Sequence, residues 1–163
     1  PCPKGYTQAP NAGACYEIKL YYDSFIGQYV KQKFDVVDRE CESSGAFLAS
    51  IHSKEEIDYV YSLMNFDHCS SNNGLNIGLK CKGKSCSWYD GSPVTYTNFD
   101  TDPRDGTATK CYCMDSFGNH SWRETDCEQD YDPAPHDCWL CKKPIECVDY
   151  ETAYNGGCVS VYS

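Results

Sequence analysis

Apolar residues recur with helical spacing in the first third of the chain. The apolar positions of this segment lie three or four residues apart: Val30, Phe34, Val37 and Cys41. Such spacing places them on one face of a helix, and the glycine at position 45 is typical of a helix end. The pattern predicts a first helix from Tyr29 to Ser43.

A second helical pattern follows a polar start signal. Ser53 and Glu56 have the spacing of a capping box, in which each side chain accepts a backbone N–H of the first helical turn. The expected buried stripe of this segment consists of Ile57, Val60, Tyr61 and Met64. We therefore expect a second helix from about Lys54 to Met64.

Beyond Met64 the pattern changes to short strands and turns. Strands are expected at 76–79, 111–117 and 121–126, with a last short strand from Trp139, and the pair 111–117 and 121–126 turns around Gly118 and Asn119. Cys81 and Cys86 flank a hairpin turn that a disulfide could close. Residues 100–110 are polar and lack apolar periodicity, which predicts a long loop, and long loops in compact domains are often functional.

The high cysteine content indicates that disulfide bonds cross-link the chain. The chain has 163 residues, enough for one domain of ordinary size, and 13 of them are Cys. That density is typical of an oxidising compartment, where disulfides persist. The odd count leaves one Cys free, bonded to another chain or without its partner. Because the chain starts at Pro1 without a Met, we expect a processed or trimmed secreted protein.

Charge narrows the function classes. The net charge of −10 disfavours nucleic-acid binding, which needs a basic surface, and no apolar run approaches the roughly 20 residues of a membrane span. Residues 100–137 hold ten acidic and three basic side chains. This segment is either a solvated surface or a site for a cation or polar ligand. The nearest grouping for zinc, His136 with Cys138 and Cys141, lacks two close ligand pairs, and we expect no metal there.

Several motifs in a fixed order resemble one known family. Those motifs are Cys2-Pro-Lys-Gly-Tyr6 with Cys15-Tyr16, then Phe34, Val37 and Cys41, Gly45-Ala-Phe-Leu-Ala-Ser-Ile-His-Ser53, Asn76-Ile-Gly-Leu79, Trp88-Tyr-Asp-Gly91, Tyr96-Thr-Asn-Phe99, and finally Cys111, Trp122, Cys127 and Cys141. Over residues 2–143 the chain resembles the long form of the C-type lectin-like domain. The resemblance implies an α+β fold in which two helices flank two small antiparallel sheets, with disulfide staples and a long recognition loop.

The resemblance also implies three disulfides: Cys2–Cys15, Cys41–Cys141 and Cys111–Cys127. The spacing of Cys69, Cys113 and Cys138 does not pair them, and one of these three is expected to be the odd thiol. An interchain disulfide or self-association through that Cys stays open.

Many members of the resembled family bind sugars through Ca²⁺, with ligands from two motifs. The matching positions here are Asp102-Pro103-Arg104 and Trp122-Arg123-Glu124. Arg stands at both positions that should supply an amide oxygen, and Arg has no acceptor atom. We therefore expect no metal and no cofactor. The candidate ligand-binding residues are Asp102, Pro103, Arg104, Asp105, Arg123 and Glu124, whose acids and Arg side chains are expected either to pair with each other or to remain separate surface charges.

The His positions do not indicate catalysis, whereas one motif indicates covalent modification. The chain has four His, and no Ser-His-Asp arrangement is visible in their spacing, so we do not expect an enzyme. Asn119-His-Ser121 is an N-glycosylation sequon in an expected turn.

The expected function is extracellular recognition of a protein or glycan without the calcium-dependent sugar site, in a secreted protein with no nucleic-acid partner and no membrane insertion. One alternative is a structural or assembly module of a secreted multidomain or matrix protein. Another is a calcium-dependent lectin with a divergent site.

The last residues suggest a repeat. We expect residues 1–143 to form the domain and 144–163 to form a linker and C-terminal extension. Cys147 and Cys158 enclose ten residues with a glycine turn, much as Cys2 and Cys15 enclose twelve. The extension is therefore either the disulfide-closed opening hairpin of a second, truncated C-type lectin-like domain or an unrelated tail.

Overall fold

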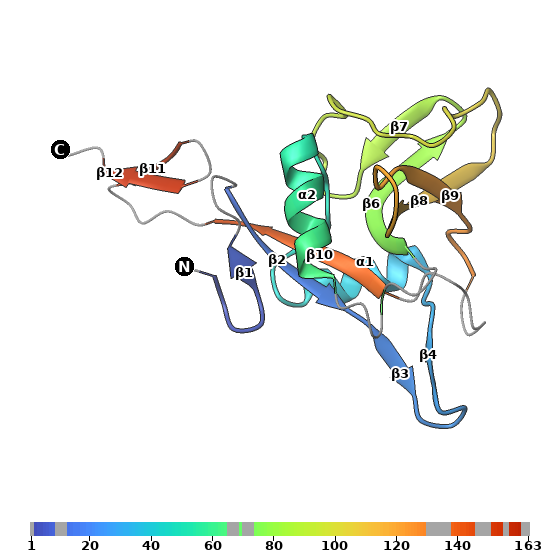
Figure 1. Ribbon diagram of the computed structural model, residues 1–163, viewed down its shortest axis with the longest axis horizontal. Coiled ribbons are helices and arrows are strands. Elements are labelled where there is room, and N and C mark those ends of the chain that lie inside the picture. Colours follow the sequence, from blue (N-terminus) through green and yellow to red (C-terminus); the bar gives the residue numbers. More distant parts are fainter. Residues whose placement is uncertain are drawn as a thin grey trace.

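A computed structural model describes residues 2–8, 13–64, 69, 74–129 and 138–145, and the backbone of 151–154 and 157–160 (Figure 1). Its helices are α1 (Phe34–Glu42) and α2 (Lys54–Leu63). Its strands are β1 (Thr7–Gln8), β2 (Ala14–Lys19), β3 (Tyr21–Asp23), β4 (Gln28–Val30), β5 (Phe47–Leu48), β6 (Gly74–Lys82), β7 (Ser85–Trp88), β8 (Thr109–Asp115), β9 (Trp122–Thr125), β10 (Cys138–Pro144), β11 (Glu151–Tyr154) and β12 (Gly157–Ser160). In this described part, neither helix has the length and apolar character needed to cross a bilayer.

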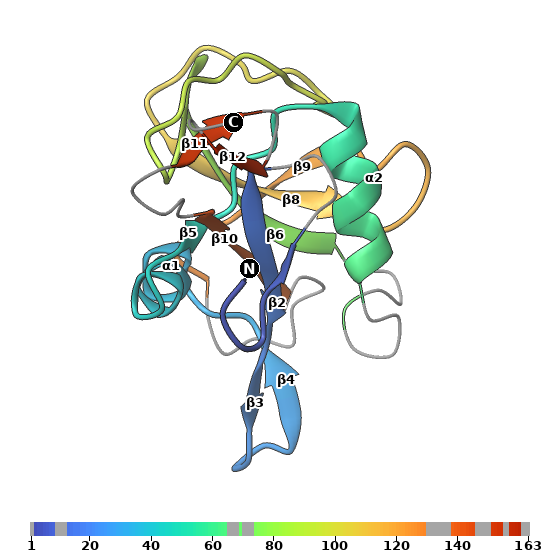
Figure 2. The ribbon, with the colours of Figure 1, turned by 90° about the vertical axis from the view of Figure 1, so that its left-hand side faces the viewer.

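Most strands join one mixed sheet of order β1-β2-β10-β6-β8-β9, with β5 added on β10 and β7 on β6. Every pairing is antiparallel except β10 with β6, which are parallel at two positions, Cys138↔Leu75 and Trp139↔Asn76. This short parallel contact connects the two antiparallel groups that the family resemblance implied. Figure 2 shows α1 and α2 on opposite sides of β2 and β10. The α+β C-type lectin-like fold is confirmed.

The first helix is shorter than its periodicity predicted. It begins at Phe34 rather than Tyr29, because residues 28–30 pair with β3 in a two-stranded hairpin. The Asp23 carboxylate fixes the turn of that hairpin by accepting the N–H groups of Phe25 and Ile26 at 2.8 and 3.4 Å. Val30 is buried as a strand residue, so its helical spacing from Phe34 was coincidental.

The second helix agrees with its sequence signals. Ser53 caps it by accepting the Glu56 N–H at 3.0 Å, and the Glu56 carboxylate accepts the His52 N–H at 2.7 Å. Ile57 and Val60 are buried against the sheet, and Met64 beyond the helix end is also buried. Tyr61, expected in the buried stripe, is only half-buried and stacks on the ring of His120 with centroids 4.1 Å apart.

The backbone of residues 48–49, between the two helices, lies in close contact with the backbone of the central strand β6. Gly78 in β6 donates its N–H to the Ala49 carbonyl at 2.8 Å, and a Cβ on Gly78 would lie 2.4 Å from the Leu48 carbonyl oxygen. The β6–β8 pairing shifts register at this point, between Ile77 and Lys80. Glycine at position 78 is therefore required by contact between backbones.

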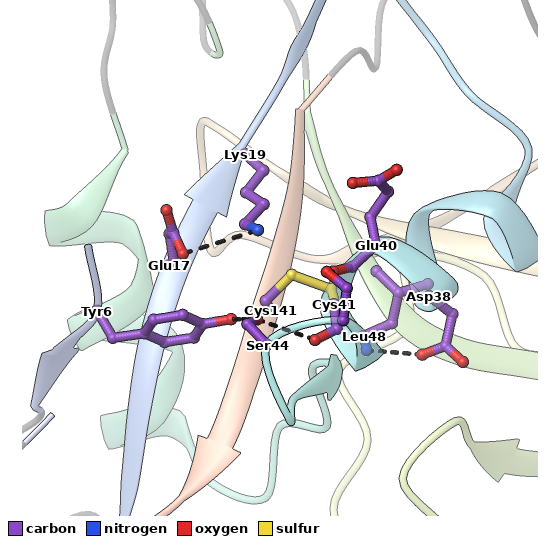
Figure 3. Close-up of a disulfide and its surroundings, with 10 residues drawn as sticks. Tyr6, Glu17, Lys19, Asp38, Glu40, Cys41, Ser44, Leu48 and Cys141 are labelled. Carbon is purple, nitrogen blue, oxygen red and sulfur yellow. Dashed lines mark hydrogen bonds and ion pairs between the residues drawn. A yellow bond between two sulfur atoms is a disulfide. The ribbon is translucent and has the colours of Figure 1, made fainter. Parts of the chain in front are cut away.

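Five disulfides cross-link the described residues. Cys2–Cys15, Cys41–Cys141 and Cys111–Cys127 are the pairs that the resemblance implied, and Cys81–Cys86 closes the β6–β7 hairpin. Figure 3 shows Cys41–Cys141 joining α1 to β10, beside the buried Asp38 carboxylate that accepts the Leu48 N–H at 2.9 Å. Burial raises the pKa of Asp38, although the hydrogen bond from Leu48 partly offsets the effect.

The fifth bond resolves most of the cysteine ambiguity. Cys69 pairs with Cys138, which sequence spacing did not predict, and Cys113 remains a thiol within the described residues. Cys113 lies fully buried on β8, and burial raises its pKa to about 12. A buried, protonated thiol is poorly placed for an interchain bond, which argues against Cys113 as the linking residue. Cys147 lies outside the described residues.

The first domain extends slightly beyond its expected boundary at residue 143. β10 continues to Pro144, which pairs with Ala14, and the Ile145 N–H donates to the Gly13 carbonyl at 3.0 Å. Proline is tolerated there because it stands at the end of the strand. Further on, β11 and β12 form a separate antiparallel hairpin.

Candidate functional site

The long loop begins earlier than the sequence indicated, because no helix or strand occupies residues 89–108 between β7 and β8. Its base is tied to β9. Phe99 forms a parallel bridge with Trp122, the Trp122 N–H donates to the Asn98 carbonyl at 2.8 Å, and the Asp100 N–H donates to the Trp122 carbonyl at 2.9 Å. The loop therefore leaves the body of the domain from a fixed backbone position (Figure 1).

An aromatic cluster supports this base. Trp122 is fully buried and meets Trp88, Tyr96 and Phe99 edge-on, with ring centroids 5.4, 6.0 and 5.7 Å apart. Edge-to-face aromatic pairs contribute about 0.5–1.5 kcal/mol beyond their buried area. Phe99 also meets Tyr112 at 5.2 Å. Burial, together with the Glu124 charge, raises the pKa of Tyr112 to about 12.

The far side of the loop rests on the β6–β7 turn. Gly83 has φ +58°, and a Cβ on it would lie 2.6 Å from the Gly106 carbonyl oxygen. Beside this contact, Lys84 Nζ lies 3.7 Å from Asp105 Oδ2. Both of these side chains are largely exposed, so the ion pair contributes little stability. The turn forms a wall of the site through backbone contact.

Two adjacent cavities lie along the loop. The larger has a volume of about 890 Å³ and is lined by Lys84, Cys86, Val94, Thr97, Phe99, Asp102, Pro103, Arg104 and Asp105. The smaller, of about 350 Å³, is lined by Asp100, Thr101, Asp102, Arg104, Trp122, Arg123 and Glu124. Asp102 and Arg104 belong to both. The six residues selected from the sequence therefore all lie at these two cavities.

Two of the candidate charges fit neither alternative left open by the sequence, since Arg123 and Asp105 each pair with a residue outside the candidate set. Arg123 turns toward β8, where its Nη2 and Nε lie 2.5 and 2.6 Å from Asp115 Oδ1. Asp105 pairs with Lys84 instead of with an Arg. The physical reason is strand register, since Cys113 stands opposite Arg123 and brings Asp115, on the same face, within reach.

Sequence reasoning missed five residues of the larger cavity, Lys84, Cys86, Val94, Thr97 and Phe99, and three of the smaller, Asp100, Thr101 and Trp122. The β6–β7 turn was recognised as a hairpin, but its contact with residue 106 spans more than 20 positions and leaves no local pattern. Phe99 was recognised as part of a family motif only.

A polar cluster at the start of α2 brings Ser, His and Asp side chains together. His52 Nε2 lies 3.0 Å from Ser92 Oγ, and the Asp90 carboxylate accepts from both Ser50 and Ser92 at 2.5 Å. In a catalytic triad the carboxylate orients the imidazole. Here Asp90 binds the two hydroxyls instead, so the cluster joins the 90–92 turn to the helix start.

Asn119 of the sequon is exposed in the β8–β9 turn, and its backbone carbonyl accepts from Asn98 Nδ2 at 3.1 Å. Within the described residues, no group of three or more His, Cys, Asp or Glu side chains is arranged to hold a metal ion.

Similar solved structures share this architecture. A calcium-independent type II antifreeze protein superposes with a TM-score of 0.65 at 23% identity, covering 88% of this chain and 94% of that chain. The cow C-type carbohydrate-recognition domain of CD23 superposes with a TM-score of 0.66 at 22% identity, covering 90% and 98%. At these identities the likeness concerns the fold alone.

Proteins with similar sequences, and a matching family model, identify the family. Snaclec agglucetin subunit alpha-2 of Deinagkistrodon acutus is 32% identical over 77% of this chain and 79% of its own length, and subunit alpha-1 is 31% identical over 61% and 60%. The rat C-type mannose receptor 2 is 25% identical over 88% of this chain but only 10% of the receptor. The match thus spans less than two thirds of subunit alpha-1 and of the receptor. The family model described as "Lectin C-type domain" matches residues 30–143, and the chain belongs to this C-type lectin family.

Proposed function

We propose that the chain is an extracellular recognition module that binds a protein or glycan ligand at the two loop cavities. The C-type lectin-like family is a class of binding modules. The observation that supports this site is the convergence of cations and carboxylates from separate segments, Lys84, Arg104, Asp102 and Asp105, around one cavity of about 890 Å³. That volume lies in the usual range of ligand sites. The secreted setting fits the five disulfides.

The proposed recognition is independent of calcium. Ca²⁺ takes six to eight oxygen ligands, whereas Arg104 and Arg123 line the smaller cavity and offer only N–H donors. Arg123 further engages the Asp115 carboxylate. These residues do not fit a calcium site, and they favour hydrogen bonds to ligand oxygens instead.

Thermal melting with millimolar Ca²⁺ and with chelator tests this point. We expect nearly equal midpoints. A ligand present at 100 times its dissociation constant would add about 2.7 kcal/mol of stability, which would appear as a rise of several degrees. A rise of that size would contradict calcium independence.

Ligand identity is best approached with glycan and extracellular-protein arrays, each probed with and without chelator. Arg104→Ala should abolish binding to the selected ligand, because Arg104 borders both cavities. Arg39→Ala is the matched control, since Arg39 is exposed on α1 and lines neither cavity. If Arg104→Ala and Arg39→Ala lost ligand binding equally, or if neither lost it, the binding site would lie outside the two cavities.

We also propose that Asn119 carries an N-linked glycan, supported by its exposure in a turn. A mass decrease on glycosidase treatment of secreted protein, absent in Asn119→Gln, is the expected result.

For the C-terminal segment we propose the opening hairpin of a second C-type lectin-like domain. The strand registers support it. In the first hairpin Cys15 stands opposite Gln8, six positions after Cys2. In the last hairpin Cys158 stands opposite Ala153, which lies six positions after Cys147.

The neighbouring pairs correspond as well. A Thr five positions after the first Cys stands opposite the residue that follows the second Cys, in Thr7↔Tyr16 and in Thr152↔Val159. Six residues separate the paired Gln8 and Cys15, whereas four separate the paired Ala153 and Cys158, which accounts for the spacing of ten rather than twelve. Peptide mapping of the disulfides should find Cys147 bonded to Cys158. Any other partner for Cys147 would end the repeat hypothesis.

A further inference from the structure

The hairpin made by β3, its turn and β4, residues 21–30, projects from the domain as an arm (Figure 1, Figure 2). Its tip is apolar and unusually exposed. Phe25 is 100% exposed, and Tyr22, Ile26 and Tyr21 are 52%, 48% and 44% exposed. Together these side chains present roughly 400–500 Å² of surface to solvent, which is comparable to the largest patch on a typical monomer.

The arm has its own supporting interactions. β3 and β4 pair in register from Tyr21↔Val30 to Asp23↔Gln28, and the Gly27 N–H donates to the Asp23 carbonyl at 2.8 Å. The rings of Tyr22 and Tyr29 meet edge-on at 5.1 Å. The tip residues are therefore held away from the core by a defined turn.

The exposed surface of the arm carries no charge. Asp23 is the only ionisable acid in residues 21–30, and it is 8% exposed and engaged with the turn N–H groups. The long loop between β7 and β8 lies at the opposite end of the molecule from the arm in both views (Figure 1, Figure 2).

A groove lies at the root of the arm. It has a volume of about 600 Å³, and its apolar walls come from Ile18, Leu20, Tyr21, Val36 and Trp139. Two of the charges on its rim, Glu17 and Lys19, lie 4.0 Å apart and offset each other (Figure 3). One patch of surface thus combines an apolar protrusion with a recess that is apolar at five of its nine lining residues, the other four being Glu17, Lys19, Gln32 and Glu40.

We propose that the arm is a self-association surface, through which two copies of this chain form a twofold dimer with their arms antiparallel. In this arrangement Phe25 and Ile26 of each copy enter the groove at the root of the other arm. A twofold interface requires a self-complementary patch, and the adjacent protrusion and recess provide one. The acidic loops of the two copies would point away from each other, which limits repulsion.

Backbone pairing is available as well. Among the described strands, β3 pairs only with β4, so the other edge of β3 could add to the partner's arm. The exposed apolar area is below the roughly 800 Å² per partner of a stable interface. We therefore expect a weak dimer whose population depends on concentration. A lipid surface is a less favoured occupant, because the arm lacks the basic residues that usually accompany an apolar anchor.

Sedimentation velocity of the full chain over about two orders of magnitude in concentration tests the proposal. We expect a monomer–dimer equilibrium, and F25S/I26S should weaken it at least tenfold. The control is Phe117→Ser, which removes a side chain 56% exposed in the β8–β9 turn and should leave the dimer unchanged. The affected side chains are exposed, so matching circular dichroism spectra and unfolding midpoints should verify that all variants fold.

A purely monomeric wild-type chain, or equal dimerisation of F25S/I26S and wild type, would overturn the proposal. Cosedimentation of a monomeric wild-type chain with phosphatidylcholine vesicles, lost in F25S/I26S, would overturn it in favour of lipid. When the single variants Phe25→Cys and Val36→Cys are mixed, we expect a disulfide between the two proteins, because the tip of one copy would lie in the groove of the other. If the dimer persists but this disulfide does not form, the tip does not bind in the groove. The F25S/I26S variant should still bind ligand at the two loop cavities, so this test is independent of the test of the proposed ligand site.

Discussion

The Cys41–Cys141 bond should stabilise the domain more than the Cys81–Cys86 bond, by an amount that depends on Cys69–Cys138. The perturbation is replacement of each pair by Ala, in a Cys113→Ser background that prevents exchange with the free thiol. Cys41–Cys141 spans 100 positions, whereas Cys81–Cys86 spans five. In the chain-entropy model, a bond constrains the unfolded chain more strongly as the loop that it closes becomes longer.

The other disulfides shorten the relevant loop. With Cys69–Cys138 intact, the shortest covalent ring through Cys41–Cys141 contains the 28 positions from Cys41 to Cys69 and the three from Cys138 to Cys141. A ring of about 31 residues corresponds to about 3.7 kcal/mol, against about 2 kcal/mol for the five-position loop of Cys81–Cys86. Without Cys69–Cys138 the shortest ring passes through Cys111–Cys127 and holds about 84 residues, which raises the contribution to about 4.6 kcal/mol.

Urea unfolding followed by tryptophan fluorescence measures these differences. Removal of Cys41–Cys141 should cost about 1.5–2 kcal/mol more than removal of Cys81–Cys86. It should cost about 1 kcal/mol more again when Cys69 and Cys138 are also replaced. Equal costs for the two single removals, or strict additivity of the Cys41–Cys141 and Cys69–Cys138 removals, would refute the entropic reasoning.

Three further changes should have measurable effects. Gly78→Ala should lower the unfolding free energy by about 1–3 kcal/mol in urea, because its Cβ would meet the Leu48 carbonyl oxygen at 2.4 Å. Burial, reinforced by the Lys142 charge, lowers the pKa of His52 below 6.5, so stability should fall as the pH drops below 6.5, and His52→Gln should flatten that part of a pH–stability curve. Asp115→Ala removes the partner of Arg123 and should cost about 1 kcal/mol by thermal melting, whereas an unchanged midpoint would show that the pair is not stabilising.

Short sequence motifs correctly predicted those helix ends that are stabilised by contacts between residues close in the chain. The capping pair Ser53 and Glu56 marked the start of α2 correctly, since a cap is satisfied within one helical turn. The helical spacing of Val30 and Phe34 failed to mark the start of α1. Strand pairing with β3 competed for residues 28–30, and an Asp23 turn decided the outcome.

Sequence reasoning alone gave the fold family, the approximate positions of β6, β8, β9 and β10, four disulfide pairs and the acidic part of the loop at the cavities. These follow from motifs with fixed spacing and from short-range turns. Three features depend on the packing of the folded chain: the bond of Cys69 to Cys138, the pairing of Arg123 with Asp115, and the contact of Gly83 with Gly106. Each joins segments whose relative position is set by sheet register and backbone packing, and such contacts between distant residues leave no periodic trace along the chain.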